Sequence, residues 1–442
     1  MLSQVYLTIS NGQQGGCREE MWLIAGARIA ITRPQLARYM ASSATVSVIP
    51  KAGLGTTVYA PSWVLEEEDR KRYIPGGYHP ARVGDSYADK RYSITGKLGW
   101  GEYSTVWRAR DNQAGIDVAI KIMTDEATHA PQLCELEFFN HLCRQNPSHV
   151  GYPHVLHLTD SFSIDGPHGR HLCVVMEMAL CNLLSIAQQS FDECRIPEFG
   201  AKRVIRDVLC ALDYVHSECN IIHTDVKITN VVMTAPLEEM PKAGWGAFFP
   251  AELYTFPAFP EYNINAPVTI TKSIQMVPDL NDPKAWLMHS FKLIDFGVAC
   301  YADKIDQHFT QDVCPVGLRP PEVALRAGWG KPVDIWSVGC MLYGMLVGKP
   351  LFPAWCDLSL LPVYQLQALG EFPASLRNRS PIRSLRDKDA FPKKSLEIWM
   401  EEQTGGTLTL TSDCMHFMRR MLTLEPNERA SVEELLRHPW LN

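Results

Sequence analysis

The segment His223-Thr-Asp-Val-Lys-Ile-Thr-Asn230 contains three side chains that suit one kind of chemistry. Transfer of a phosphoryl group to a hydroxyl needs a carboxylate that accepts the hydroxyl proton, a cation beside the γ-phosphate and oxygen ligands for Mg²⁺. Asp225, Lys227 and Asn230 supply these functions within one loop. We therefore predict phosphoryl transfer, with Asp225 and Lys227 as catalytic residues and Asn230 as a metal ligand.

A second metal ligand is predicted at Asp295. It ends the apolar run Phe291-Lys-Leu-Ile-Asp-Phe-Gly297, and Gly297 allows the backbone to turn there. Taken alone, Asp-Phe-Gly is equally typical of a turn that ends a strand. Because the loop 223–230 precedes it in the chain, we interpret Asp295 as the partner of Asn230 in a metal site.

A turn with two glycines is the predicted binding site for the phosphates of a nucleotide. Gly99 and Gly101 lie between two β-like runs, and the absence of a side chain lets backbone N–H groups approach phosphate oxygens. Such turns also occur in ordinary hairpins. We assign nucleotide binding to the whole segment, which comprises Leu98, Gly99, Trp100, Gly101, Glu102, Tyr103, Ser104, Thr105 and Val106.

Lys121 lies near the end of the apolar run 117–122, just after this hairpin. A lysine there usually extends to solvent, but it can hold the α- and β-phosphates when a carboxylate orients it. Glu135, in the helical pattern that follows, is the best candidate for that carboxylate. Glu137 points about 200° away around the helix, so only one of the two can face Lys121. We predict that Lys121 and Glu135 bind nucleotide and that Lys121 also serves catalysis.

Two patterns of hydrophobic spacing divide the chain. Short β-branched and aromatic runs extend from residue 92 to about 175, with one helical pattern at 131–144. Beyond residue 180 the spacing is helical, at 201–216, 333–346, 361–369, 412–422 and 431–437. The sequence predicts an α+β fold with a small β-rich lobe at about 92–178 and a larger helical lobe at about 179–441. The turn-rich segment 73–91 is predicted to lead into the first lobe as a loop.

Residues 235–290 interrupt the helical lobe. This stretch contains eight prolines and many aromatic residues, and it separates two segments whose chemistry belongs together. So many prolines argue against a helix or a central strand. We predict an insertion whose aromatic side chains pack on another part of the protein.

Charge is distributed unevenly along the 442 residues. The net charge is −7, yet residues 1–65 carry five basic and two acidic side chains, whereas residues 66–442 carry 37 basic and 47 acidic ones. The acidic body is a mild argument against direct binding of nucleic acid and favours basic partners. Residues 1–72 are predicted to be a leader. Its acid-free part leaves two interpretations open, an organellar targeting peptide or a disordered leader.

The cysteines and the apolar runs exclude several classes of protein. None of the thirteen cysteines forms a Cys-x-x-Cys pair, which argues against a zinc ribbon or a thioredoxin-like centre and favours a reducing compartment. The longest apolar run, 338–347, is about half as long as the ~20 residues that a membrane span requires. We expect a monomer in the cytoplasm or nucleus with no membrane span.

The order of these motifs, followed by Pro320-Pro-Glu322, resembles the eukaryotic protein kinases over residues 92–441. The resemblance implies a two-lobed kinase fold that holds ATP and Mg²⁺ between the lobes, with the backbone of Glu177 to Ala179 as the hinge beside adenine. It also implies that Asp334 hydrogen-bonds the backbone of the catalytic loop. Glu322 and Arg429 resemble the buried ion pair of that family.

Finer features are similar to the SR-protein kinases. The segment Tyr73-Ile-Pro-Gly-Gly-Tyr-His-Pro80 and the loop around Trp100 follow that family, and Ile222-His-Thr-Asp225 is shared with Clk-type kinases. The resemblance implies transfer to serines in Arg/Ser-rich splicing factors. A Clk-like kinase with other substrates is the alternative enzyme, and a pseudokinase scaffold is the alternative outside the enzymes. The scaffold is disfavoured because every predicted catalytic side chain is present.

The sequence departs from most regulated kinases at three places. Thr224 replaces the arginine that grips an activation-segment phosphate, and residues 295–322 contain only Tyr301 and Thr310 as hydroxyl side chains. These two features predict a constitutively active enzyme. Ser104 replaces a glycine of the usual loop, and Ile228-Thr229 replaces the usual Pro-Glu, but neither change removes a catalytic atom.

Overall fold

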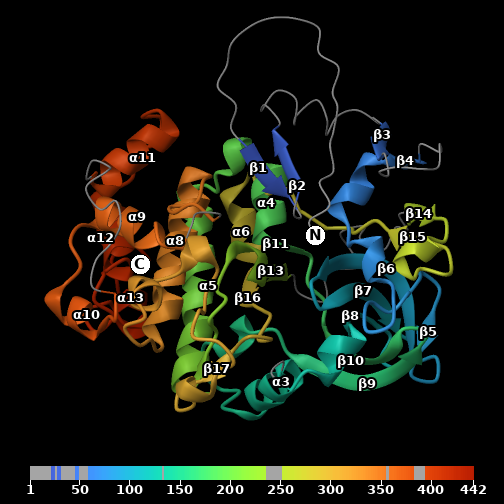
Figure 1. The fold of residues 1–442 in the computed structure, drawn as a ribbon. Helices are drawn as coiled ribbons and strands as arrows, with labels where there is room; N and C mark the ends of the chain where they lie inside the picture. The colour runs from blue at the N-terminus through green and yellow to red at the C-terminus, as the bar shows by residue number, and fades with distance from the viewer. Residues whose placement is uncertain are drawn as a thin grey trace, which may run out of the picture.

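The chain forms two lobes in a computed structural model that describes residues 21–24, 27–30, 45–48, 58–131, 134–234, 251–354, 358–382 and 394–442. Figure 1 shows a lobe built on a β-sheet beside a lobe built of helices. The predicted α+β fold with a smaller β-rich lobe and a larger helical lobe is confirmed.

The small lobe is built on a six-stranded antiparallel sheet in the order β5-β6-β7-β8-β10-β9. Its strands are β5 (Ser86–Tyr87), β6 (Tyr92–Gly101), β7 (Ser104–Asp111), β8 (Ile116–Met123), β9 (Leu158–Gly166) and β10 (Gly169–Glu177). One face of the sheet packs into a core around Trp107, Ile120 and Val175. The β6–β7 hairpin ends where Gly101 pairs with Ser104, so the sheet carries the glycine turn at its tip.

Two helices accompany this sheet where one was predicted. We expected a helix from residue 131, but the structure has α2 (Asp125–His129) and a separate α3 (Glu135–Arg144), with residues 132–133 outside the described part. Ala130 is extended (ψ 110°) and ends α2. The reason is Pro131, because the residue before a proline avoids helical backbone angles.

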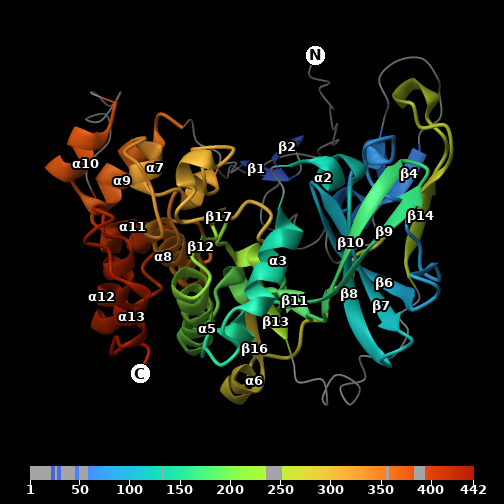
Figure 2. The same cartoon turned by 90° about the horizontal axis from the view of Figure 1, so that it is seen from below.

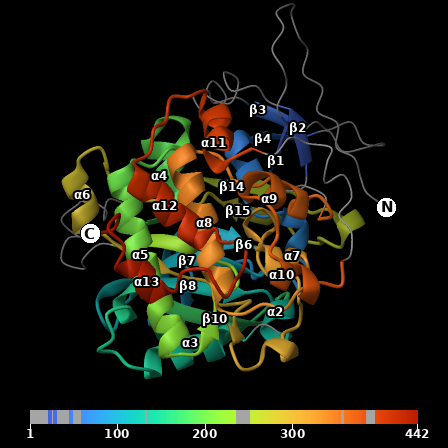
Figure 3. The ribbon, with the colours of Figure 1, turned by 90° about the vertical axis from the view of Figure 1, so that its left-hand side faces the viewer.

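The large lobe is organised around two long helices, α5 (Glu198–Ser217) and α8 (Pro332–Val347). Nearly all of α8 is buried, and Gly348 ends it with a left-handed φ of 75°. Figure 3, which faces this lobe, shows α5, α8 and α12 in front of the sheet. The five predicted helices are confirmed as α5, α8, α9 (Leu361–Leu369), α12 (Ser412–Met421) and α13 (Val432–Leu436). The lobe also contains α4 (Leu183–Ser190), α7 (Pro321–Ala324), α10 (Ala374–Arg379) and α11 (Leu396–Thr404). Within the described ranges, every helix is too short or too polar to cross a membrane.

Short strands at the junction of the lobes place the catalytic segments. One sheet has the order β11-β13-β16 and comprises β11 (Cys181–Asn182), β13 (Val231–Thr234) and β16 (Ser290–Leu293). A second pairs β12 (Ile221–Ile222) with β17 (Cys300–Tyr301). Figure 2 shows β11, β13 and β16 between α5 and the large sheet. The loop 223–230 joins β12 to β13 and Asp295 follows β16, so the pairing of β13 with β16 brings the two segments together.

The insertion contains a hairpin and one helix, of which the helix is the element that the proline count argued against. It forms the hairpin β14 (Leu253–Phe256) and β15 (Val268–Thr271) and the helix α6 (Pro283–Met288), while residues 235–250 lie outside the described part. The expectation of no helix is therefore wrong at 283–288, whereas the expectation of no central strand is not contradicted, because β14 and β15 form a two-stranded sheet. Pro257 and Pro267 flank the two strands and Pro283 lies in the first turn of α6, where prolines are tolerated.

The aromatic face of the insertion packs on the segment that precedes the sheet. Phe256, Ile264 and Ile270 share a small core with Ala60, Val64, Tyr73 and Tyr78. Residues 60–72, which the sequence assigned to the leader, are thus part of a packed unit. Strand β4 (Val58–Pro61) enters this unit, and β1 (Met21–Ile24), β2 (Ala27–Ala30) and β3 (Thr45–Val48) precede it in the chain. The leader's other residues before 58, and with them the targeting interpretation, lie outside the described residues.

Candidate active site

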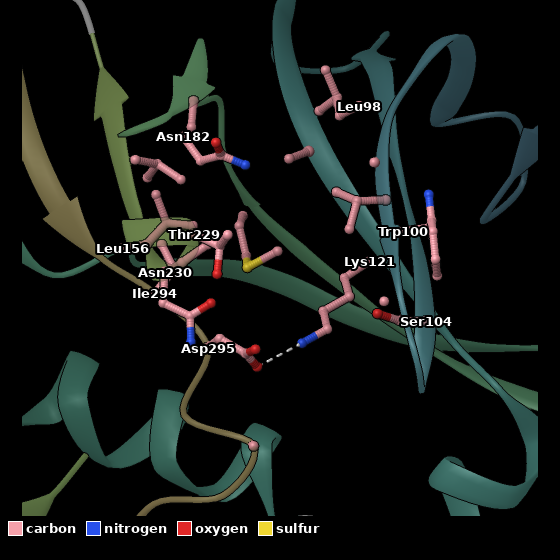
Figure 4. A pocket seen from close by; sticks show the side chains of 18 of the residues that line it. Leu98, Trp100, Ser104, Lys121, Leu156, Asn182, Thr229, Asn230, Ile294 and Asp295 are labelled. Carbon is pink, nitrogen blue, oxygen red and sulfur yellow. Dashed lines mark hydrogen bonds and ion pairs between the residues drawn. The ribbon is translucent and has the colours of Figure 1, made fainter. Parts of the chain in front are cut away.

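A cavity of about 650 Å³ lies between the two lobes. Strands β6, β7 and β8 form one wall, and β11, the loop 223–230 and residues 294–298 form the other. Figure 4 shows Leu98 and Lys121 on one side, facing Asn182, Asn230 and Asp295 on the other. The lining combines apolar side chains with charged ones, a combination that suits a molecule with a flat base and phosphates.

Lys121 lies at the centre of an ion-pair network in this cavity. Its Nζ donates to both oxygens of Glu135, at 2.6 and 2.7 Å, and to Oδ1 of Asp295 at 3.2 Å. Burial opposes the charged ammonium, but Asp295 and Glu135 outweigh that effect and raise the pKa of Lys121. The same ammonium lowers the pKa of Asp295. The cavity therefore holds a permanent cation next to an ionised carboxylate.

The choice between the two glutamates of α3 is settled by their contacts. Glu135 is 3% exposed and faces Lys121. Glu137 points to the outside, where it accepts a hydrogen bond from the Tyr301 hydroxyl at 3.2 Å. Glu135 is thus the carboxylate that orients Lys121, and Glu137 instead links α3 to the segment that follows Asp295.

Asp225 lies in the cavity with its predicted partners around it. Its Oδ2 accepts hydrogen bonds from Lys227 Nζ at 2.7 Å and from Asn230 Nδ2 at 2.9 Å. One oxygen of the carboxylate is therefore fixed by two donors. A hydroxyl that approaches the other oxygen would meet an acceptor of defined orientation, which is the arrangement that proton removal requires.

A buried aspartate holds the backbone of the catalytic loop. Asp334, at the start of α8, is fully buried and accepts hydrogen bonds from the backbone N–H groups of His223 and Thr224, both at 2.8 Å. His216 Nε2 donates to it as well, at 2.8 Å. Thr224 has a φ of 66°, a left-handed conformation that is uncommon for a threonine. We infer that Asp334 maintains this conformation, and it occupies the position that the family resemblance implied.

Asn230 and Asp295 both line the cavity and supply the oxygen atoms suited to a divalent metal. Because the amide nitrogen of Asn230 donates to Asp225, its amide oxygen is the atom available as a ligand. Among the described residues, no group of three or more His, Cys, Asp or Glu side chains is placed to hold a metal. Two protein ligands fit a metal whose remaining ligands are phosphates and water.

The glycine hairpin is placed as predicted, with one exception. Eight of its nine residues line the cavity, but Thr105 does not: it is fully buried and its hydroxyl accepts a hydrogen bond from Trp107 Nε1 at 2.9 Å. Successive residues of a strand point to opposite faces, so Ser104 and Val106 face the cavity and Thr105 faces away. The Thr105 side chain therefore makes no part of the cavity wall, and its assignment to nucleotide binding stays a prediction. The indole of Trp100 donates to the carbonyl of Glu66 at 3.0 Å, so this ring is held by the segment before the sheet.

The predicted hinge also lines the cavity. Glu177 and Ala179 are both part of the wall. The Glu177 carboxylate accepts hydrogen bonds from Lys292 Nζ at 2.7 Å and from the backbone N–H of His157 at 3.0 Å. Its side chain thus serves the structure of the lobe junction, and the contact of the hinge backbone with a bound base stays a prediction.

Sequence reasoning missed several residues of the wall. Some are apolar side chains that any buried strand could supply, namely Leu156, Leu180, Val232 and Ile294. Cys181 and Asn182 follow the hinge directly, and their place in the chain could have indicated them. Gln275 comes from the insertion, and nothing in the local sequence distinguishes it from a surface glutamine.

Removal of Arg429 is expected to destabilise the large lobe strongly. Both partners of the ion pair are fully buried, and the guanidinium donates to the two oxygens of Glu322 at 2.7 and 2.9 Å. Arg429→Ala leaves a buried carboxylate without a cation, and such a change costs about 3–5 kcal/mol. Urea unfolding measures the loss. The control is Arg437→Ala, whose exposed pair with Glu433 contributes about 0–1 kcal/mol; equal losses would contradict the prediction.

The comparisons with known proteins agree with this geometry. The family model described as protein kinase domain matches residues 92–242 and 280–441. The chain is 31% identical to the serine/threonine-protein kinase SRPK of Physarum polycephalum, over 85% of this chain and 91% of the relative. It is 27% identical to the protein kinase dsk1 of Schizosaccharomyces pombe, over 85% of both chains. It is 23% identical to the human SRSF protein kinase 3, over 85% and 90%.

The match to the family model leaves out residues 243–279, which fall within the insertion. The two matched parts contain Lys121, Asp225 and Asp295, which the structure brings to one cavity. The chain therefore belongs to the protein kinase family, as an ATP-dependent serine/threonine kinase with its relatives among the SRPK enzymes.

Proposed function

We propose that this kinase transfers the γ-phosphate of ATP to serines in Arg/Ser-rich proteins, uses Mg²⁺, and is active without phosphorylation of its activation segment, residues 295–322. The resemblance to the SR-protein kinases supports the substrate, and one relative is named SRSF protein kinase 3. Asp225 would accept the serine proton, Lys227 and Lys121 would hold phosphate oxygens, and Asn230 and Asp295 would hold the metal, which offsets the charge of the phosphates.

The proposed constitutive activity rests on the hydrogen bond that the Thr224 side chain makes. Where a phosphate-binding arginine stands in regulated kinases, the Thr224 hydroxyl donates to the backbone carbonyl of Val298 at 2.7 Å. This bond ties the activation segment to the catalytic loop without any charge. A phosphate would find no cation at that position.

The rest of the activation segment is held by side chains that contact backbone carbonyls of the segment itself. The buried guanidinium of Arg319 donates to the carbonyls of Asp312, Val313 and Cys314, at 3.1 to 3.2 Å. His308 contacts the carbonyls of Val298 and Thr310, at 3.1 and 2.6 Å. These contacts order the segment in the unmodified chain, which supports activity without a phosphate.

The charge of the activation segment supports a cationic substrate. Three exposed aspartates, Asp303, Asp306 and Asp312, face solvent there, against a single exposed lysine, Lys304. The chain beyond residue 65 is also acidic. An arginine-rich peptide would be attracted to such a surface, and the attraction would weaken as salt screens it.

We expect kcat to stay within about twofold of the untreated protein after phosphatase treatment, and also in a Tyr301→Phe, Thr310→Ala double variant. Both treatments remove the possibility of a phosphate on the segment and leave the Thr224 contact intact. The measurement is the rate on an Arg/Ser repeat peptide, with Asp225→Ala as the blank. Loss of activity on dephosphorylation, restored by phosphorylation of the segment, would contradict the proposal.

The same assay tests the substrate. We expect a higher kcat/KM on the Arg/Ser peptide than on a Ser-Pro peptide, and a KM for the former that rises with salt. Equal values for both peptides would overturn the assignment to Arg/Ser substrates and favour a Clk-like specificity. Binding of ATP without transfer to any peptide would favour a scaffold.

A further inference from the structure

Residues 271–277 of the insertion lie along both lobes at one edge of the nucleotide cavity. The backbone N–H of Ile274 donates to the carbonyl of Lys97 in β6, and the N–H of Met276 donates to the carbonyl of Leu180 just past the hinge, both at 2.9 Å. Lys97 and Ser273 also form a parallel bridge. A short stretch of backbone is thus fixed at one end to the strand that carries the glycine turn and at the other end to the large lobe.

Gln275 lies between these two attachments, and its side chain spans the same gap. Its amide nitrogen donates to the carbonyl of Leu98. Its amide oxygen accepts from the backbone N–H of Asn182 at 3.3 Å and from the Ser185 hydroxyl at 3.4 Å. Figure 4 shows Leu98 and Asn182 facing the cavity from opposite walls, and Gln275 itself lines the cavity. One side chain therefore connects the two walls of the nucleotide site.

A buried cluster holds this stretch against β6. The ammonium of Lys97 is fully buried and donates to Glu68, to Glu67 at 2.7 Å and to the carbonyl of Thr271 at 3.0 Å. Glu67 in turn accepts from the backbone N–H and the hydroxyl of Ser273, at 2.6 and 2.7 Å. A buried charge is stable only with its partners in place. The segment before the sheet, strand β6 and the insertion are thereby locked together.

We propose that residues 271–277 form a strap that fixes the separation of the two walls of the nucleotide site, with Gln275 as a positioning residue for nucleotide binding. The strap exists before a nucleotide enters, so less conformational freedom is lost when the base and sugar are held between Leu98 and Asn182. Because the strap acts on the walls and not on the phosphates, it strengthens the binding of ATP and of ADP alike. The described hydrogen bonds of the Asp225 side chain come from Lys227 and Asn230 and not from the strap.

Gln275→Ala is expected to raise the KM for ATP and the Kd for ADP by about five- to tenfold, since it removes hydrogen bonds to both walls. Gln275→Glu keeps the acceptor for Asn182 and Ser185 but has no donor for Leu98, and we expect a similar increase. kcat and the KM for the peptide are expected to stay within about twofold of the original values. The measurements are steady-state kinetics and calorimetric titration with ADP on the full chain.

Lys272→Ala is the matched control. Lys272 belongs to the same strap, but its ion pair with Glu252 is exposed and lies outside the cavity lining. The proposal is overturned if Gln275→Ala binds ADP as tightly as the original protein. It is also overturned if Lys272→Ala raises the Kd for ADP as much as Gln275→Ala does. It is also overturned if Gln275→Ala lowers kcat and the melting temperature without changing nucleotide affinity, because that result indicates a purely structural role.

Discussion

Asp225→Asn is expected to lower kcat by about 10²–10⁴-fold while the KM for ATP changes little. The substitution keeps the size of the side chain and replaces the proton acceptor with an amide. Lys227 and Asn230 both donate to Asp225 Oδ2, so an asparagine that offers its oxygen to them turns its NH₂ group toward the position of the substrate hydroxyl. The loss should therefore fall on the chemical step, and steady-state kinetics on the Arg/Ser peptide separates kcat from KM.

The control for this prediction is Asp213→Asn, the same chemical change at a site on α5 outside the cavity lining. Asp213 contacts His149 at 3.5 Å near the surface, and its replacement should leave kcat unchanged. Nucleotide binding of Asp225→Asn, measured by calorimetry, shows whether the site remains intact. If that variant binds ATP normally and still turns over at the original rate, Asp225 is not the proton acceptor.

The residues that line the cavity as candidates for catalysis could be predicted, because each belongs to a short segment whose residue types suit phosphoryl transfer. The loop 223–230 holds three functional side chains within eight residues, and no long-range contact is needed to identify them. Asp295 and Lys121 each end or nearly end an apolar strand, which is a local pattern as well. Helices α5, α8, α9, α12 and α13 could also be predicted from the sequence, because the helical spacing of apolar residues is a property of neighbouring positions.

The unit formed by residues 60–72 and the insertion could not be predicted, because its contacts join distant parts of the chain. Lys97 lies 30 residues from Glu67 and 174 residues from Thr271. In the sequence, the run Glu66-Glu67-Glu68 is typical of a solvated surface, yet two of these side chains are buried around Lys97. Pairing of charges over such distances follows from the tertiary structure, and a single sequence does not contain that information.

The helix missed in the insertion and the inclusion of Thr105 have local causes. The insertion was interpreted from its proline content, but Pro283 lies in the first turn of α6, where a proline is tolerated. Thr105 was included because the whole hairpin was treated as one binding segment. The alternation of side chains along β7 would have excluded it, since Ser104 and Val106 already occupy the face toward the cavity.

Asp334→Asn is expected to lower kcat by about 10²-fold and the stability by about 1–3 kcal/mol, although this residue touches no substrate. The carboxylate accepts from the backbone of His223 and Thr224 and from His216, all at 2.8 Å. An asparagine has one acceptor oxygen, so its NH₂ group would face at least one of these donors. The backbone that carries Asp225 would then lose the contact that fixes it, and a small displacement of a proton acceptor has a large effect on rate.

Arg429→Ala separates this positioning effect from a simple loss of stability. Arg429 is buried against Glu322 and contacts the carbonyl of Pro332, but neither partner is part of the loop 223–230. We therefore expect Arg429→Ala to lower the stability more than Asp334→Asn and to leave the kcat of the folded fraction close to the original value. Both variants are assayed well below their unfolding midpoints, with the folded fraction measured by circular dichroism. If Asp334→Asn retains full kcat per folded molecule, the loop does not need the aspartate, and the contacts of His223 with the carbonyl of Ile294 and of Thr224 with the carbonyl of Val298 are sufficient to hold it.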